Sequence, residues 1–303
     1  MRMLFVYTID NCKIERHRRI RGVDMAYKLV CIDIDGTLLN KKHTITKRTK
    51  DILVKAHDLG VHIVISTGRM YTDAEYYSNL LGVQSPVIAS NGAFIKEKNN
   101  DKVIYKDVLG SEVSLELLKI FRKHQIKPYF CTPHKFYYGN IMFRLFYLGT
   151  QIWGVRSNKL DLQYVCSWNQ WQKVLHKEQD NIVKSEVIYR NPALVSALRN
   201  ELLNVPQLEI ADSSRYNIEI TRKGVSKGKA VAMLAEFYNL KREEIITIGD
   251  SANDISMIEF AGMGIAMGNA LKIVKERADY ITDSNDNEGV ANAINKFILD
   301  NRF

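Results

Sequence analysis

Apolar runs that predict strands alternate with amphipathic stretches that predict helices near both ends of this chain. The runs are short and almost wholly apolar, as expected of strands buried on both faces. In the first block the strands are expected at 27–34, 61–66 and 86–90, and the helices at 46–59 and 70–81. In the last block the strands are expected at 245–249, 264–267 and 279–282, and the helices at 227–239, 254–261, 270–277 and 288–300. Strands separated by single helices predict a parallel sheet with helices on both faces.

The pattern changes between residues 93 and 220. Strands there alternate apolar and polar residues, which is typical of a sheet with one face toward solvent. The clearest are KVIYKDV (102–108), KFYYG (135–139), SEVIY (185–189) and YNIEIT (216–221), with helices expected near 111–124, 168–177 and 192–203. We therefore expect an α/β core, formed by 25–92 and 221–303, that is interrupted by an inserted α+β domain over 93–220.

Composition narrows the class of protein but not its activity. The 303 residues are 46% hydrophobic and 25% charged, as in globular proteins, and no apolar run approaches the roughly 18 residues of a membrane-spanning helix. The net charge is +9, and apart from the basic residues 1–24 it is spread widely. Four cysteines without metal-ligand spacing suit a reducing compartment, so we expect a cytoplasmic protein. Residues 1–24 lack the cleavage site of a secretory signal and are interpreted as an N-terminal extension outside the fold.

Two carboxylates follow the first apolar run. In KLVCIDIDGTLLN (28–40), Asp33 and Asp35 stand at the carboxyl edge of the predicted sheet, where open α/β folds bind ligands. Residues i and i+2 of an extended chain point the same way, so both acids should face one point. Their repulsion requires a cation such as Mg²⁺ between them, or a proton on one, which suits a nucleophile beside a general acid. A surface turn with acidic residues is the alternative.

Two later segments offer groups for an anion. STGR (66–69) places Thr67 and Gly68 where free backbone N–H groups at a helix start would favour one, with simple helix capping as the alternative. GVSKGKA (224–230) places Lys227 at a helix start, where a cation opposes the helix dipole unless an anion lies nearby. A solvated lysine is the alternative there.

GDSANDISM (249–257) completes the set, because Asp250 ends a buried strand while Asn253 and Asp254 begin the next helix. These groups together are typical of a site that binds a metal ion and a phosphate. In chain order they are an acid pair, a Thr-Gly step, a lysine and an aspartate. This arrangement resembles the haloacid dehalogenase superfamily, and specifically its Cof-type phosphatases with a large inserted α/β cap. The segments that carry the resemblance are DIDGT (33–37), STGR (66–69), GVSKGKA (224–230), GDSANDISM (249–257) and MGNA (267–270). The resemblance covers about 25–303 and implies a Rossmann-like parallel-sheet core with an α+β cap at 93–220.

The resemblance also implies a role for each acid of the motifs. Asp33 would be the nucleophile that becomes an aspartyl phosphate, and Asp35 the general acid and then the general base. The cofactor would be Mg²⁺, bound by the Asp33 carboxylate, the Asp35 backbone carbonyl and Asp250. Asp254 would orient Lys227 or the groups around the metal.

The remaining motif residues would bind the phosphoryl group. Thr67 and the amides of Gly68 and Ile34 would hold its oxygens, and Lys227 would balance the charge. Asn253 would make a further phosphate contact.

The cap would close over the acid pair and select the substrate. SNGAF (90–94) lies at the junction with the core, so Asn91 and Gly92 are candidate substrate contacts, with a plain turn as the alternative and Asn217 as a weaker candidate. We expect the aromatic residues of 129–153 to pack the cap sheet, with ring stacking on a flavin or base as the alternative. They are Tyr129, Phe130, Phe136, Tyr137, Tyr138, Phe143, Phe146, Tyr147 and Trp153.

The leading hypothesis is Mg²⁺-dependent hydrolysis of a phosphomonoester of a small metabolite, such as a sugar phosphate or FMN, through an aspartyl phosphate. A phosphomutase, a C–halogen hydrolase and a non-enzymatic sensor of phosphorylated metabolites are the alternatives. Asp35 argues against the C–halogen hydrolase, which needs no acid at that position in this superfamily. We expect a small phosphorylated metabolite as partner, no nucleic acid, no membrane, and a monomer or weak homo-oligomer.

Overall fold

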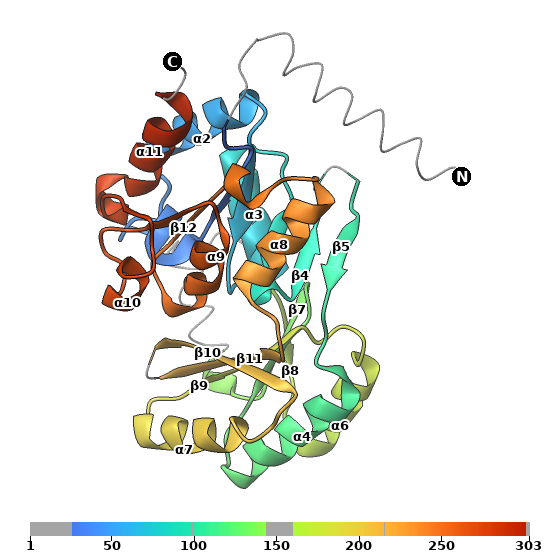
Figure 1. The fold of residues 1–303 in the computed structure, drawn as a ribbon. Coiled ribbons are helices and arrows are strands. Elements are labelled where there is room, and N and C mark those ends of the chain that lie inside the picture. The colour runs from blue at the N-terminus through green and yellow to red at the C-terminus, as the bar shows by residue number, and fades with distance from the viewer. Residues whose placement is uncertain (1–25, 99, 144–159, 215, 301–303) are drawn as a thin grey trace.

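The chain folds around two β-sheets, each with its own helices (Figure 1). The structure is a computed structural model and describes residues 26–98, 100–143, 160–214 and 216–300. The predicted N-terminal extension, residues 1–24, lies outside the described residues, as do Phe146, Tyr147 and Trp153. Within the described ranges, no helix combines the length and the apolar character needed to cross a bilayer.

The larger sheet, here called the core sheet, has eight strands in the order β14-β13-β12-β1-β2-β3-β4-β5. Pairing is parallel from β14 to β3, and β4 and β5 add two antiparallel strands at one edge. Its strands are β1 (Leu29–Ile32), β2 (His62–Ser66), β3 (Val87–Ala89), β4 (Phe94–Lys96), β5 (Val103–Lys106), β12 (Ile245–Gly249), β13 (Met263–Ala266) and β14 (Tyr280–Ile281). Ile32, the last residue of β1, lies between Ile248 and Ile65, so the central strands end side by side.

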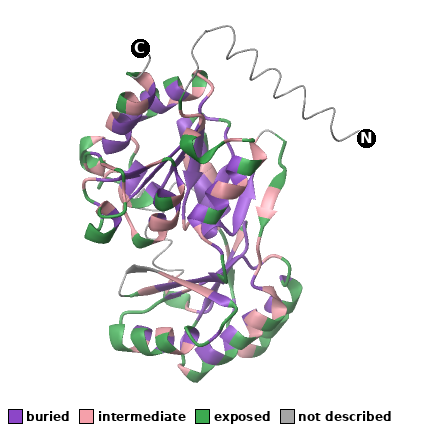
Figure 2. Ribbon diagram, viewed as in Figure 1, coloured by how far each residue is buried: buried purple, intermediate pink, exposed green. Residues whose placement is uncertain are grey.

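Helices cover both faces of the core sheet, which explains its uninterrupted apolar strands. On β1, Val30 and Ile32 pack toward α2, α3 and α11, whereas Leu29 and Cys31 pack toward α8 and α9. The burial colours of Figure 2 show this buried centre. The helices are α2 (Lys47–Asp58), α3 (Tyr71–Leu81), α8 (Lys227–Phe237), α9 (Ile255–Phe260), α10 (Lys272–Lys275) and α11 (Gly289–Ile294). The predicted α/β fold with a parallel core sheet is confirmed.

The smaller sheet, here called the cap sheet, has six strands in the order β10-β11-β9-β6-β7-β8. Its pairing is antiparallel except for the parallel pair β7–β8. Helices α4 (Gly110–Lys123), α6 (Trp168–Lys177) and α7 (Pro192–Leu202) cover the face away from the core, and with the sheet they form the cap (Figure 1). Its strands are β6 (Tyr129–Cys131), β7 (Lys135–Tyr138), β8 (Asp161–Tyr164), β9 (Lys184–Ile188), β10 (Leu208–Ser214) and β11 (Asn217–Arg222).

The junction between core and cap differs from the sequence prediction. Strands β4 and β5 fall within 93–220, yet they are hydrogen-bonded to the core sheet, so the predicted boundary at residue 93 is too early. KVIYKDV contains β5, the edge strand of the core sheet, in which no residue is fully buried. The chain crosses to the cap after β5 and returns after β11, and these crossings are close, with Arg222 3.7 Å from Asp107.

Short helical turns connect these elements. They are η1 (Ile34–Leu38), η2 (Ser90–Gly92), η3 (Arg242–Glu244), η4 (Ala252–Asp254), η5 (Asn285–Asn287) and η6 (Asn295–Leu299). Of these, η1 overlaps DIDGT, and η2 and η4 lie within SNGAF and GDSANDISM.

Candidate active site

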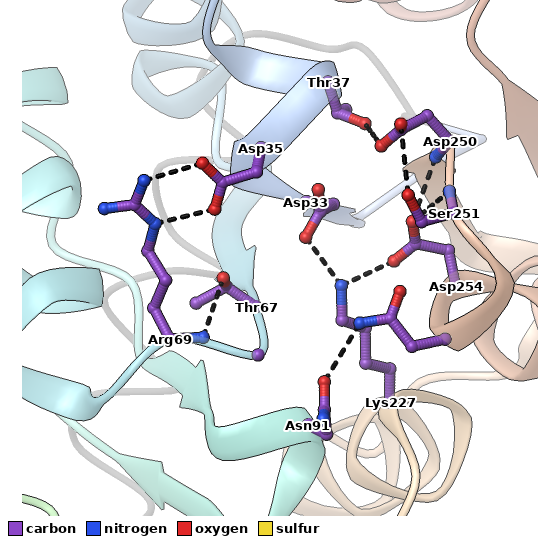
Figure 3. A network of polar contacts seen from close by, with 12 residues as sticks. Asp33, Asp35, Thr37, Thr67, Arg69, Asn91, Lys227, Asp250, Ser251 and Asp254 are labelled. Atoms are coloured by element: carbon purple, nitrogen blue, oxygen red, sulfur yellow. Dashed lines mark hydrogen bonds and ion pairs between the residues drawn. The ribbon is translucent and has the colours of Figure 1, made fainter. Parts of the chain in front are cut away.

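Asp33, Asp250 and Lys227 meet at the carboxyl ends of the central core strands (Figure 3). Asp33 directly follows β1, Thr67 follows β2 and Asp250 follows β12. Lys227 is the first residue of α8 and points toward the same place. Because these strands are adjacent and parallel, residues up to 217 positions apart in the chain become neighbours.

Lys227 connects two of the acids. Its Nζ donates to Asp33 Oδ1 at 2.6 Å and to Asp254 Oδ1 at 2.5 Å. The Lys227 side chain is fully buried, so the alternative of a solvated lysine is wrong. Burial lowers the pKa of Lys227, but Asp254 and Asp33 outweigh burial and hold the pKa above its usual range. The ammonium therefore stays charged, and two carboxylates supply the anion that its position at a helix start requires.

The acids around Lys227 form a possible metal site. Carboxylate oxygens of Asp33, Asp250 and Asp254 lie within 4.8 Å of one another. Asp254 is already engaged, because Oδ1 accepts from Lys227 and Oδ2 accepts from the amides of Asp250 and Ser251, both at 2.9 Å. Carboxylate oxygens suit a hard cation such as Mg²⁺, so these three acids are the candidate ligands.

Hydrogen bonds and burial hold Asp250 in place. Thr37 Oγ1 donates to its Oδ1 at 3.0 Å, and Ser251 Oγ donates to its Oδ2 at 3.2 Å. Burial, with a further contribution from the nearby Asp254, raises the pKa of Asp250 to about 6. Burial also raises the pKa of Asp33 well above its usual value, although Lys227 opposes the shift. A cation between these carboxylates would relieve their repulsion.

Gly36 has no side chain, which lets Asp250 approach the loop that follows β1. Its φ is +78°, in the left-handed region, and a Cβ there would lie 2.4 Å from Asp250 Oδ2. The Gly36 carbonyl accepts a hydrogen bond from Asn269 Nδ2 at 2.8 Å, which brings MGNA to the site as well. The glycine is therefore required both by its conformation and by the close carboxylate.

Asp35 does not point to the same place as Asp33. Strand β1 ends at Ile32 and the chain then turns, so the prediction from strand alternation is wrong at this position. Arg69 holds Asp35 through two hydrogen bonds, Nε to Oδ2 at 2.7 Å and NH2 to Oδ1 at 2.6 Å (Figure 3). Partial burial raises the pKa of Asp35, but these bonds outweigh it and lower the pKa overall.

Thr67 and Gly68 lie in a turn and not at a helix start. Helix α3 begins later, at Tyr71, so the prediction that Gly68 opens the helix is wrong. Thr67 Oγ1 accepts from the Arg69 amide at 3.2 Å, which closes a small turn within STGR. Any anion held here would meet the amides of this turn rather than a helix N-terminus.

Asn91 and Asn253 come together, whereas Gly92 faces elsewhere. Asn253 Nδ2 donates to Asn91 Oδ1 at 3.0 Å, and Asn91 Nδ2 donates to Glu219 Oε2 at 2.7 Å. Gly92 packs on the start of α8, where a Cβ would lie 2.4 Å from the Ser226 carbonyl oxygen. Asn91 thus links the core to the cap, and the close packing of Gly92 is explained by the helix.

The described aromatic residues of 129–153 mostly pack within the cap, as the sequence predicts. Phe130 and Tyr137 join the cluster under the cap helices. Tyr129, Phe136 and Tyr138 form a second cluster with Met70 of the core, and Phe143 packs against it. Asn217 lies on β11, on the same side of the strand as Glu219, because the two are two residues apart.

Several residues of this site were not predicted. Three of them lie inside the motifs: Arg69, Thr37 and Asn269. Because they are polar and lie within the same motifs as the predicted site residues, the sequence could have indicated them. Lys184 and Glu219 carry no such signal. They contact Gly68 and Asn91 from cap strands, and their partners are more than 100 residues away in the chain.

Comparison with known proteins decides the family. A model of the haloacid dehalogenase-like hydrolase family matches residues 30–294. The chain belongs to this family. Its motifs and inserted cap place it with the Cof-type phosphatases, as the resemblance implied, and it is a phosphatase of the HAD superfamily.

Named relatives act on small phosphorylated metabolites. The chain is 33% identical over 280 residues to the 5-amino-6-(5-phospho-D-ribitylamino)uracil phosphatase YcsE of Bacillus subtilis, covering 92% of this chain and 99% of that one. It is 25% identical to the pyridoxal phosphate phosphatase YbhA of Escherichia coli, covering 91% and 100%. A solved HAD subclass IIB sugar phosphatase matches with a TM-score of 0.73 and 26% identity, covering 89% and 98%. This HAD phosphatase therefore shares its whole architecture, core and cap, with enzymes of that kind.

Proposed function

We propose that this HAD phosphatase hydrolyses a phosphomonoester of a small metabolite with Mg²⁺ as cofactor and Asp33 as the nucleophile. The observation that carries the proposal is the buried Lys227, which holds Asp33 Oδ1 and Asp254 Oδ1 while Asp250 lies alongside. This arrangement keeps one Asp33 oxygen fixed, and a Mg²⁺ ion held by these acids would supply the positive charge that a phosphate dianion needs.

Each side chain has a distinct part in the reaction. Asp33 attacks phosphorus, the bond to the leaving oxygen breaks, and an aspartyl phosphate forms. Asp35 gives a proton to the leaving alcohol and later takes one from the water that attacks the aspartyl phosphate. Thr67 and the amides of Gly68 and Ile34 hold phosphoryl oxygens, and Asn253 makes a further phosphate contact. Lys227 balances the charge on Asp33 and the phosphate.

The ion-pair with Arg69 determines when Asp35 can act. Arg69 favours the ionised carboxylate, which is a poor acid. Asp35 must therefore leave Arg69, or share it with the substrate, before it can donate its proton. Asp33 and Asp250, with the Asp35 carbonyl, would hold Mg²⁺, which stabilises negative charge on the phosphoryl group when bound.

The substrate is proposed to be a phosphorylated metabolite such as a sugar phosphate, FMN or a vitamin-precursor phosphate. The names of the relatives support this class, because they specify a ribitylaminouracil phosphate, pyridoxal phosphate and a sugar phosphate. Asn91, whose side chain lies between Asn253 of the core and Glu219 of the cap, is the proposed contact to the rest of the substrate, whereas Gly92 packs against α8.

The test is a phosphate-release screen over phosphorylated metabolites, with Mg²⁺ and with EDTA, on the parent chain and Asp33→Asn. We expect activity that requires Mg²⁺ and is lost in Asp33→Asn. Asp161→Asn, at the exposed start of β8, is the matched control and should keep full activity. Undiminished activity in Asp33→Asn or in EDTA would overturn the proposal, and transfer of the phosphoryl group to a second metabolite in place of water would favour the phosphomutase.

A further inference from the structure

We propose that Lys184 of the cap is a positioning residue for the phosphate-binding turn of the core, acting through the peptide between Gly68 and Arg69 on the Thr67 hydroxyl. This inference rests on the proposed function, since that function assigns Thr67 to the phosphoryl group. It adds a residue of the other sheet to the apparatus that binds phosphate.

Lys184 reaches from the cap sheet into the core. It is the first residue of β9, its side chain is 2% exposed, and its Nζ donates to the Gly68 carbonyl at 2.6 Å. Nζ also contacts Glu219 Oε2 at 3.3 Å and forms an ion pair with Glu186. Burial lowers the pKa of Lys184, but the two glutamates outweigh burial and keep the pKa above its usual range. The charged Lys184 ammonium therefore binds the Gly68 carbonyl in the phosphate-binding turn.

That carbonyl is coupled to Thr67 by covalent geometry. The peptide unit is planar, so fixing the Gly68 oxygen also fixes the direction of the Arg69 N–H. The Arg69 N–H donates to Thr67 Oγ1 at 3.2 Å. Because that hydroxyl oxygen accepts one hydrogen bond, its own proton is directed away from Arg69 and can be donated to a phosphoryl oxygen.

A second branch of the same network reaches the other side of the turn. Glu219 accepts from Asn91, which in turn accepts from Asn253. Asn91 has φ +57°, a conformation that few residues other than glycine adopt. A Cβ on Gly68 would lie 2.9 Å from Asn91 Oδ1 and 3.0 Å from Glu219 Oε2. The two branches thus enclose Gly68 tightly and leave the turn little freedom.

A purely structural tie between cap and core is the alternative role for Lys184. Such a tie would change stability, and its loss would act on the rate independently of Thr67. Positioning through Thr67 makes a different prediction, because two residues that act through one hydroxyl give non-additive effects.

The experiment is a double-mutant cycle with Lys184→Met, Thr67→Val and the double variant, using a phosphomonoester that the parent chain hydrolyses. We expect Lys184→Met to lower kcat/KM by about 10- to 100-fold, the size expected for misplaced catalytic groups. The double variant should be no slower than Thr67→Val alone. Lys135→Met, which removes a cap lysine paired with Glu178, should match the parent.

Unchanged kcat/KM in Lys184→Met, or a double variant whose loss is the product of the two single losses, would overturn the inference. Thermal melting checks that each variant folds. If Lys184→Met does not fold, Lys184→Met/Glu219→Gln, which also removes one negative charge, replaces it in the cycle. Asp33→Asn separates the two proposals. If Asp33→Asn keeps its activity, the proposed function is overturned. If Asp33→Asn is inactive but the Lys184→Met and Thr67→Val losses multiply, only the role of Lys184 is overturned.

Discussion

The core sheet and the cap sheet present their polar side chains in different ways. In the core, Asp33, Thr67 and Asp250 stand just past strand ends, where adjacent parallel strands bring them together. In the cap, Lys184 and Glu219 lie on strands β9 and β11, and their side chains reach core residues from the face of the cap sheet. Polar residues at strand ends interrupt an apolar run and are conspicuous in a sequence. Polar residues that alternate along a strand look like an ordinary solvated face.

The largest expected effect tests the core side of this comparison. Asp35→Asn should lower steady-state kcat by about 10²- to 10⁴-fold, the range for loss of a general acid and base. With p-nitrophenyl phosphate, whose leaving group needs no proton, formation of the aspartyl phosphate should survive and its hydrolysis should stall. Rapid-mixing kinetics should then show a burst of one p-nitrophenol per enzyme. The control is Asp73→Asn, because Asp73 Oδ2 also pairs with Arg69, at 3.6 Å from NH1. This variant should give no such burst. If Asp35→Asn and Asp73→Asn lowered kcat equally and neither gave a burst, the role of Asp35 would be contradicted.

The next prediction asks whether the two sheets are separately stable. Trp171 is fully buried under the cap helices and packs on Phe130 at 5.4 Å between ring centroids. Trp171→Ala should reduce the free energy of cap unfolding by about 3–5 kcal/mol. Hydrogen exchange should accelerate in β6 and β9 and stay slow in β1 and β12, while Leu53→Ala in the core should do the reverse. An equal loss of protection in both sheets would show one cooperative unit.

A glycine pair separates backbone strain from the site itself. Gly36 and Gly82 have nearly the same positive φ, +78° and +79°, but only Gly36 has Asp250 beside it. Each Gly→Ala change should reduce stability by about 1–2 kcal/mol through backbone strain. Gly36→Ala should in addition weaken Mg²⁺ binding by about 10- to 100-fold, the effect of disturbing groups around a metal ligand. Titration calorimetry of both variants measures this, and equal affinities would show that Asp250 moves aside freely.

The smallest expected effect is a pH dependence of the core site. The pKa of Asp250 is about 6 in the folded chain, above its ordinary value of 3.8. In the metal-free chain this carboxyl therefore favours folding at pH below about 4, and that contribution is lost as pH rises through 6. Mg²⁺ needs the ionised form, so its affinity should fall about tenfold per pH unit below 6. Calorimetric titrations at pH 5, 6 and 7.5 test this. A constant affinity would mean that Asp250 is not a ligand.

The sequence predicted the parallel strands of the core sheet and the polar residues that follow them, because both depend on local signals. Apolar runs buried on both faces, followed at once by Asp33 or Asp250, specify a strand and its functional end within a few residues. The prediction was wrong where tertiary pairing decides the outcome. Strands β4 and β5 were not recognised as part of the core, because nothing local says which sheet a short strand joins.

The cap was predicted less completely for the same reason. Its helices were located within one or two residues, since an amphipathic period is a local signal. Its strands β6, β8 and β10 were missed, because they are short or irregular in pattern. Lys184 resembles a surface lysine in sequence, and only its burial against Gly68 reveals its place in the site.

The closeness of the two crossings between core and cap limits how the cap can move. Asp107 and Arg222 lie on the outgoing and returning segments and are 3.7 Å apart. A body held by two neighbouring attachments rotates easily about the line through them and resists twisting about other axes, in the manner of a hinged door. The Lys184–Gly68 and Glu219–Asn91 hydrogen bonds also join cap and core, so a rotation that separates the two would break both. Such a rotation would therefore release the turn at Gly68 and the Asn91 side chain from the cap in one movement.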